Sequence, residues 1–141
     1  MTVTSQDKDI LARTLWAEVR GESLLGMAAA AWTIRNRVND GKAKSWWGEG
    51  YAGVCQAPWQ FSCWNKNDPN YPFLAGIKPI PAKEFKIAMT VAESVIGAVT
   101  ADPTKGATHY YATTMKTPPP WAAKATKTVT IGNHAFFNNV Q

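Results

Sequence analysis

A glutamate stands in the apolar stripe of the first predicted helix. Ile10–Arg20 has the pattern of an amphipathic helix, and Leu11 and Leu15 mark its apolar stripe. Glu18 follows Leu15 by three positions and Leu11 by seven, so its side chain lies on the same stripe. Burial of a carboxyl group raises its pKa, and such a group can donate a proton near neutral pH. The pattern therefore indicates a general acid at Glu18.

A second glutamate, Glu22, follows four residues later, across Arg20 and Gly21. If the helix continued, the two carboxylates would lie about 5–6 Å apart at Cβ, and Glu22 is the near candidate for a second catalytic carboxylate. Gly21 is expected to end the helix first, which favours a supporting role for Glu22. The simpler alternative makes Glu18 a helix-end carboxylate bonded to Arg20 or to backbone amides.

Tryptophan is unusually frequent, with seven in 141 residues. Trp16 and Trp32 lie on predicted helices and are expected in the core. Tryptophan in clefts stacks on the apolar faces of sugars or on bases. The other five lie in predicted loops, where binding side chains concentrate: Trp46, Trp47, Trp59, Trp64 and Trp121.

The composition narrows the possible partners. The net charge is +5, which favours anionic partners, but the lysines are scattered and no nucleic-acid-binding motif is present, so nucleic acid is not expected. No apolar run reaches the roughly 18 residues that span a bilayer, so stable membrane insertion is not expected. The polar start has no signal-peptide pattern. The protein is therefore expected to be made in the cytoplasm.

Cysteine and histidine offer an alternative chemistry. Cys55 and Cys63, with seven residues between them, could form a disulfide or remain buried thiols, and the sequence leaves both open. Cys63 with His109 or His134 could form a peptidase pair, and the histidines with Asp102 could form a metal site. Neither arrangement has motif spacing. Structural histidines, and no metal or cofactor, are therefore expected.

Helices are predicted first and strands last. The first helix has Thr4 or Ser5 as its N-cap, and Gly132-Asn133 is a two-residue hairpin signal. This order predicts an α+β fold with three main helices and a small antiparallel sheet near the C-terminus, in a single domain over 1–141. The expected elements are helices 10–20, 24–38 and 82–100, strands 108–112, 126–131 and 134–137, and a long loop over 42–81 with short helical turns near 51–54.

Five blocks of sequence together resemble the cell-wall hydrolases related to the spore-cortex-lytic enzyme SleB. Each block is weak alone, but they occur in the family's order and cover nearly the whole chain. They are E-x-R-G-E at 18–22, N-R-V at 36–38, Q-F-S-C-W at 60–64, D-P-T-x-G-A-x-H-Y-Y at 102–111 and I-G-x-H-x-F-F at 131–137.

The resemblance implies a peptidoglycan-cleaving enzyme on a fold related to lysozyme-like and resuscitation-factor domains. It implies that Glu18 is the catalytic acid, acting on the MurNAc–GlcNAc glycosidic bond. A lytic transglycosylase needs one carboxylate, because the sugar's own C6 hydroxyl closes a 1,6-anhydro ring. A muramidase would use Glu18 together with Glu22 or a positioned water. The transglycosylase outcome is favoured.

Aromatic and polar residues on the loops and the first strand are the candidate sugar-binding set. Adjacent strand residues face opposite ways, so only one of Tyr110 and Tyr111 should face the cleft. Phe61 has core packing as its alternative. Asn36 and Arg37 are expected to hydrogen-bond to the loop after Glu18. The candidate set is Gln60, Phe61, Ser62, Trp64, His109, Tyr110, Tyr111 and Trp121.

The chain departs from the spore enzymes because it shows neither a signal peptide nor a separate wall-binding domain. It looks more like a phage endolysin, which a holin releases from the cytoplasm to the cell wall and which acts as a monomer. Two other classes stay open: an amidase or peptidase using Cys63 and a histidine or zinc, and a non-catalytic glycan-binding module built on the tryptophans and the positive charge.

Overall fold

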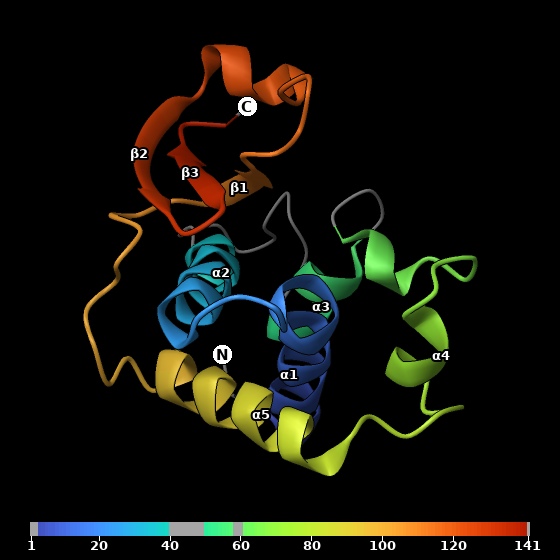
Figure 1. The fold of residues 1–141 in the computed structure, drawn as a ribbon. Helices are drawn as coiled ribbons and strands as arrows, with labels where there is room; N and C mark the ends of the chain where they lie inside the picture. The colour runs from blue at the N-terminus through green and yellow to red at the C-terminus, as the bar shows by residue number, and fades with distance from the viewer. Residues whose placement is uncertain (1–2, 40–49, 58–60, 141) are drawn as a thin grey trace.

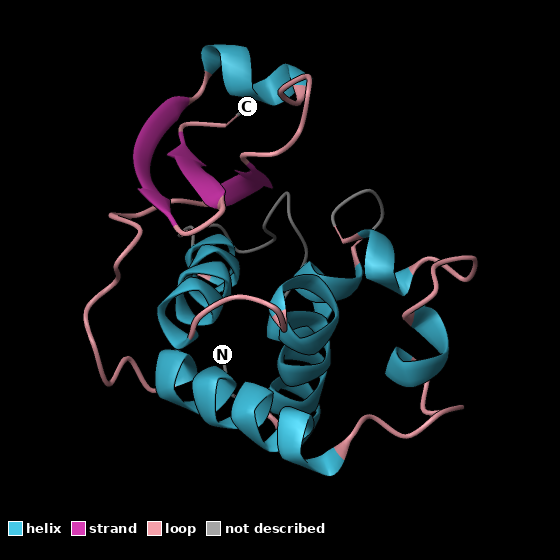
Figure 2. Ribbon diagram, in the orientation of Figure 1, coloured by secondary structure: helices cyan, strands magenta, loops and turns pink. Residues whose placement is uncertain are grey.

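The computed structural model describes residues 3–39, 50–57 and 61–140. Helices make up the lower part of the molecule and a three-stranded sheet the upper part, above one end of α2 (Figures 1 and 2). This is the predicted α+β arrangement. The helices are α1 (Ser5–Val19), α2 (Leu24–Val38), α3 (Gly50–Gln56), α4 (Tyr71–Leu74) and α5 (Ala82–Ile96), with 3-10 turns η1 (Ser62–Trp64) and η2 (Pro120–Lys124). The strands are β1 (His109–Ala112), β2 (Thr126–Ile131) and β3 (His134–Asn138).

Helix α1 begins directly after Thr4, one of the two predicted N-cap residues, and a capping box stabilises its first turn. The Thr4 hydroxyl accepts a hydrogen bond from the Asp7 amide, and the Asp7 carboxylate accepts one from the Thr4 amide. The helix ends at Val19, with Arg20 as its C-cap. Glu22 therefore lies outside the helix that carries Glu18, as the glycine at position 21 predicts.

Helix α2 has the predicted bounds and is the centre of the fold. It contacts α1, α3 and α5 on one side and β1 and β2 on the other. Its alanine run allows this close approach. Ala30 and Ala31 are buried among the helices, whereas Ala29 is buried against the sheet.

Helix α5 crosses the ends of α1 and α2 and is shorter than predicted (Figure 1). The predicted end at Thr100 is wrong. The helix stops at Ile96, because the Gly97 amide closes the last turn on Glu93 and Ala98 takes a left-handed φ of 49°. Asp102 and Gly106 instead shape the loop that follows.

The sheet has the order β1-β3-β2, with both pairs antiparallel. The predicted Gly132-Asn133 turn joins β2 to β3. Phe136 lies opposite Tyr110 on β1 and Val129 on β2, and it is 1% exposed. These inner-face side chains pack on Ala29 of α2. The sheet is thus attached to the helices through one face.

The predicted long loop contains more structure than expected. Helix α3 accounts for the predicted helical turns near 51–54 and packs against α1 and α2. Helix α4 and the 3-10 turn η1 were not predicted, and both contact α1. Among the described residues, no helix combines the length and apolar character needed to cross a bilayer.

Replacing Phe136 with alanine should destabilise the fold by about 3–5 kcal/mol, because the ring is fully buried between the sheet and α2. Chemical denaturation measures the change in the free energy of unfolding. Ile77→Ala is the matched control, since Ile77 is 73% exposed and its truncation should cost little. Equal effects for the two variants would contradict this account of the core.

Candidate active site

Glu18 lies in the last turn of α1 and is partly buried. Burial is the largest influence on this carboxyl group and raises its pKa. The Cys63 thiol donates a hydrogen bond to it, which opposes the rise, whereas the negative charge of Asp68 adds to it. Glu18 therefore holds its proton to a higher pH than a solvent-exposed glutamate does.

Tyr110 and Arg37 belong to the same buried group. Burial raises the pKa of Tyr110 well above its usual value, and the Glu18 carboxylate raises it further. Arg37 on α2 is 4% exposed, and burial lowers its pKa to about 10. Its Nε donates to the Thr108 carbonyl, and its guanidinium lies 5.3 Å from the centre of the Phe61 ring. Strand β1 thus places a neutral phenol near the candidate acid.

Glu22 joins the α1–α2 connection to the β2–β3 hairpin. Its Oε1 accepts a 2.8 Å hydrogen bond from His134 Nδ1, and the two side chains are only 13% and 15% exposed, respectively. The Asn133 amide and side chain lie 3.4 Å from the same carboxylate. The His134 and Tyr110 rings are in T-shaped contact, with ring centres 5.1 Å apart. Glu22 is therefore a bridge that holds the hairpin beside the candidate site.

The sheet separates the predicted sugar-binding aromatics into two groups. Tyr110 faces α2, together with Phe136 and His134. Tyr111 faces the other way and stacks on Phe137, with ring centres 5.4 Å apart and planes 19° apart. Only one of the two tyrosines thus lies on the side of Glu18, as strand alternation requires.

Trp121 and His109 belong to the outer group with Tyr111. Trp121 packs on His109, Tyr111 and Phe137 at centroid distances of 5.1, 6.0 and 5.4 Å. Burial, assisted by the charge of Arg37, lowers the pKa of His109 to about 3. His109 is thus a neutral, buried histidine at physiological pH. The sheet therefore places His109 and Trp121 of the candidate sugar-binding set with Tyr111, on the face opposite Tyr110.

The Q-F-S-C-W block contributes to the core next to Glu18. Phe61 is 6% exposed and Cys63 is 1% exposed, so Phe61 takes the packing role that was its alternative. The Trp64 indole donates to the Thr14 hydroxyl at 3.0 Å and is partly buried against the core. Ser62 is exposed. Gln60, like Trp46, Trp47 and Trp59, lies outside the described residues.

Asn36 does not bond to the loop after Glu18, and that prediction is wrong. Its side-chain amide donates to Asp102 at 2.9 Å and to the Ala107 carbonyl at 2.8 Å. Asp102 also accepts bonds from Thr104 and Gly106. Partial burial acts to raise the pKa of Asp102, but the hydrogen bonds from Thr104, Asn36 and Gly106 outweigh it and lower the pKa. The D-P-T block is therefore a structural loop that anchors β1 to α2.

The cysteines lack the features of a peptidase nucleophile. Both are free, buried thiols. Burial raises the pKa of Cys55 to about 12 and also raises that of Cys63, whereas a nucleophilic cysteine needs a lowered pKa. Within the described ranges, no three His, Cys, Asp or Glu side chains gather closely enough to hold a metal ion.

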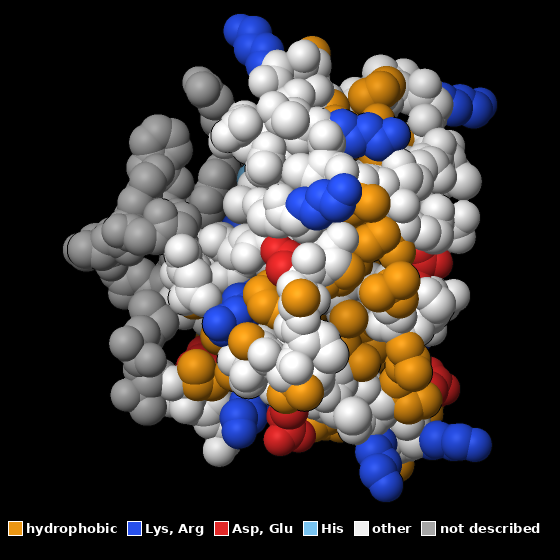
Figure 3. Space-filling view, turned by 90° about the vertical axis from the view of Figure 1, so that its left-hand side faces the viewer, with side chains coloured by type: hydrophobic (Ala, Val, Ile, Leu, Met, Phe, Trp, Pro, Cys, Tyr) orange, Lys and Arg blue, Asp and Glu red, His pale blue; other side chains and the backbone are white. Residues whose placement is uncertain are grey.

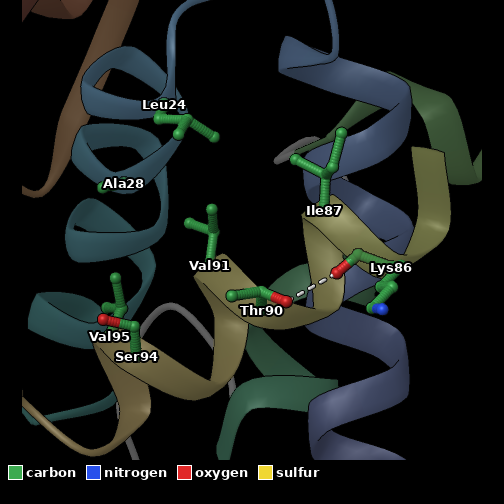
Figure 4. Close-up of a pocket in the computed structure, with 8 residues that line it drawn as sticks. All are labelled: Leu24, Ala28, Lys86, Ile87, Thr90, Val91, Ser94 and Val95. Atoms are coloured by element: carbon green, nitrogen blue, oxygen red, sulfur yellow. Dashed lines mark hydrogen bonds between the residues drawn. The ribbon is translucent and has the colours of Figure 1, made fainter. Parts of the chain in front are cut away.

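An apolar pocket of about 420 Å³ lies between α2 and α5, away from this constellation. Leu24 of α2 and Ile87 and Val91 of α5 extend into the space between the two helices (Figure 4). Among the described residues that line it, Lys86 is the one charged side chain and none carries a carboxyl group. This pocket therefore lacks a proton donor of the kind that glycosidic cleavage requires.

Comparison with known proteins identifies the family. A family model described as Cell Wall Hydrolase matches residues 21–137. The chain belongs to the cell wall hydrolase family. The matched segment includes Glu22 but begins three residues after Glu18. The evidence about Glu18 is therefore the geometry described above and not this match. The search of curated protein sequences found no significant match.

Two solved structures have similar folds. One is the catalytic domain of the germination-specific lytic transglycosylase SleB from Bacillus anthracis, with 24% identity, a TM-score of 0.72, and coverage of 96% of this chain and 97% of that chain. The other is the catalytic domain of the Bacillus cereus SleB protein, with 23% identity, a TM-score of 0.67, and coverage of 97% and 93%. These matches confirm the predicted SleB-like fold.

Two neighbours of Glu18 in this cell wall hydrolase were not predicted. Asp68 lies in a turn, where it accepts a 2.8 Å hydrogen bond from the Asn70 amide, and nothing in its local sequence connects it with Glu18. The sequence allows Cys63 to be a nucleophile, a disulfide partner or a buried thiol, but it does not connect Cys63 with Glu18. Its position after Phe61, in a block that returns to α1, was the available signal.

Substitutions at Asp68 and Cys63 should move the pKa of Glu18 in opposite directions. Asp68→Asn removes a negative charge and should lower it, whereas Cys63→Ala removes a hydrogen bond to the carboxylate and should raise it. Carboxyl-selective NMR titration of Glu18 measures both shifts. Glu93→Gln is the control, since Glu93 is exposed on α5. Shifts of the same sign at Asp68 and Cys63 would refute the assignment of these neighbours.

Proposed function

We propose that this cell wall hydrolase is a lytic transglycosylase that cleaves the MurNAc–GlcNAc bond of peptidoglycan, with Glu18 as its general acid. The observation that carries the proposal is the partly buried position of the Glu18 carboxyl group at the end of α1, near Cys63 and Tyr110, and this burial raises its pKa. Cleavage of a glycosidic bond requires a protonated carboxyl group beside the bridging oxygen.

The proposed reaction uses this one carboxyl group twice. Glu18 donates its proton to the bridging oxygen, the bond from that oxygen to C1 of MurNAc breaks, and positive charge develops at C1. The C6 hydroxyl oxygen of the same sugar then bonds to C1, and its proton passes to the Glu18 carboxylate. The products are a 1,6-anhydro end and a free GlcNAc hydroxyl, with no water consumed.

The contacts of Glu22 favour this outcome over hydrolysis. A muramidase would need a second carboxylate that acts on the sugar or on water. Both oxygens of Glu22 face hairpin groups, namely His134 and Asn133, and its side chain is 13% exposed. This engagement supports a positioning role for Glu22. Muramidase action by Glu18 and Glu22 is the second candidate.

The cellular setting that we propose is that of a phage endolysin, released by a holin and acting on the wall as a monomer. The positive net charge supports binding to an acidic wall polymer. Clearing of host cells that depends on co-expression of a holin would support this setting, and clearing without one would contradict it.

Glu18→Gln should lose lytic activity by about 10²–10⁴-fold, because glutamine has the same shape but donates no acidic proton. A turbidity assay on purified cell walls measures the loss. The variant should also be more stable than wild type at neutral pH. The raised pKa makes the native state bind more protons than the unfolded state, so stability falls as pH rises through the folded pKa, and glutamine removes that fall. Full activity would eliminate Glu18 as the acid.

Mass spectrometry of digested peptidoglycan should find muropeptides ending in 1,6-anhydro-MurNAc. These are one water lighter than the reducing products of hydrolysis, because the C6 hydroxyl rather than water attacks C1. A known muramidase digest supplies the hydrated reference. Predominantly hydrated MurNAc ends would favour the muramidase alternative, and hydrated GlcNAc ends would assign a different bond.

A further inference from the structure

Nearly all of the net charge lies at the sheet end of the molecule. Residues 103–141 contain four lysines and neither aspartate nor glutamate, whereas the preceding residues contain eleven basic and ten acidic side chains. In the face shown in Figure 3, the charged side chains over the top of the molecule, where the sheet lies, are blue. The four residues are Lys105, Lys116, Lys124 and Lys127, and all are exposed.

A pocket of about 410 Å³ opens on the outer side of this sheet. Its walls are the stacked rings of Tyr111 and Phe137, the Pro118–Pro120 run, and Ala122 and Ala123 of η2. Consecutive prolines form a stiff extended segment, and the rings are held by contacts with Trp121. The pocket is therefore preformed, with flat apolar walls of the kind that pack on sugar rings.

Three of the lysines are neighbours of pocket residues, either along the chain or across the β2–β3 strand pair. Lys127 is paired with Phe137 across β2 and β3, and directly paired residues share a face of a sheet. Lys124 follows Ala123 in η2, and Lys116 lies two positions before the proline run. The aromatic and proline walls thus have cationic groups near their edge and no carboxylate in the same region of sequence.

We propose that the outer face of the sheet is an accessory site that binds a peptidoglycan strand away from the scissile bond. The apolar faces of its sugars pack on the Tyr111 ring and the proline run, and the carboxylates of its stem peptides pair with Lys116, Lys124 and Lys127. Tyr111 and Tyr110 lie on opposite faces of β1, so this site is distinct from the Glu18 site. The inference depends on peptidoglycan being the substrate, as proposed above.

Binding to insoluble sacculi tests the accessory site without requiring cleavage. In a Glu18→Gln background, combined Lys116→Gln, Lys124→Gln and Lys127→Gln should weaken cosedimentation about tenfold, because small contributions from three exposed charge pairs add. Lys78→Gln, Lys83→Gln and Lys86→Gln, at exposed positions in and before α5, are the matched control and should bind like the parent. Added salt should weaken the parent and spare the triple variant.

A single substitution tests the pocket itself. Ala123→Glu places a negative charge in its lining and should weaken binding at least as much, whereas Ala82→Glu, at another exposed alanine, should not. With Glu18 intact, the triple lysine variant should cleave short soluble glycan fragments at the rate of wild type, since the site acts on long strands.

Three results would overturn the accessory site: equal retention of the sheet-end and control triple variants, equal binding of the two glutamate variants, or binding lost from sacculi stripped of phosphodiester-linked polymers. The last would assign the lysines to a phosphate-bearing polymer. Wild-type lysis by Glu18→Gln would instead reject the catalytic proposal. The sedimentation comparison of the two triple variants would still test the accessory site.

Discussion

The attachment of the sheet to helix α2 is the constraint on which the rest of the structure depends. Ala29 leaves room for Phe136, Asn36 holds the loop before β1, and Arg37 bonds to the backbone where that strand begins. These contacts fix the height and direction of β1 above the helices. As a result, Tyr110 lies near Glu18 even though they are 92 positions apart in the chain.

Burial of the Glu18 carboxyl group destabilises its ionised form. This raises its pKa and favours the protonated form that could act as an acid. Two neighbours act on the pKa of Glu18 in opposite directions. Cys63 supplies a weak hydrogen bond that lowers the pKa, while the like charge of Asp68 raises it. The buried Arg37 side chain donates a hydrogen bond to the Thr108 carbonyl, and the Glu22 carboxylate is hydrogen-bonded to His134. The arrangement leaves Glu18 as a carboxyl group with a raised pKa, the candidate proton donor, and Glu22 as a second carboxylate bonded to the hairpin.

The two faces of the sheet serve different purposes. The inner face packs on α2 and carries Tyr110 and His134 toward the candidate site, whereas the outer face is covered by η2 and bordered by the proline run. Strand alternation alone requires adjacent tyrosines to diverge. It therefore divides aromatic residues that are neighbours in sequence between the face next to the candidate acid and the face where we propose that a glycan strand binds.

The sequence by itself determined the three main helices, the β2–β3 hairpin and the position of Glu18 in an apolar stripe. Caps, the alanine run and the Gly132-Asn133 turn are local signals, so α2, β2 and the hairpin could be predicted with their bounds. Residues far apart in the chain carry no such signal. Only the tertiary structure decided that Cys63 and Asp68 influence Glu18, that His134 holds Glu22, that Asn36 bonds to Asp102, and that Trp121 and His109 lie with Tyr111. Those pairings depend on how the sheet packs on α2. Long-range packing, not local periodicity, sets which side chains lie in the same dielectric environment and which hydrogen-bond to one another.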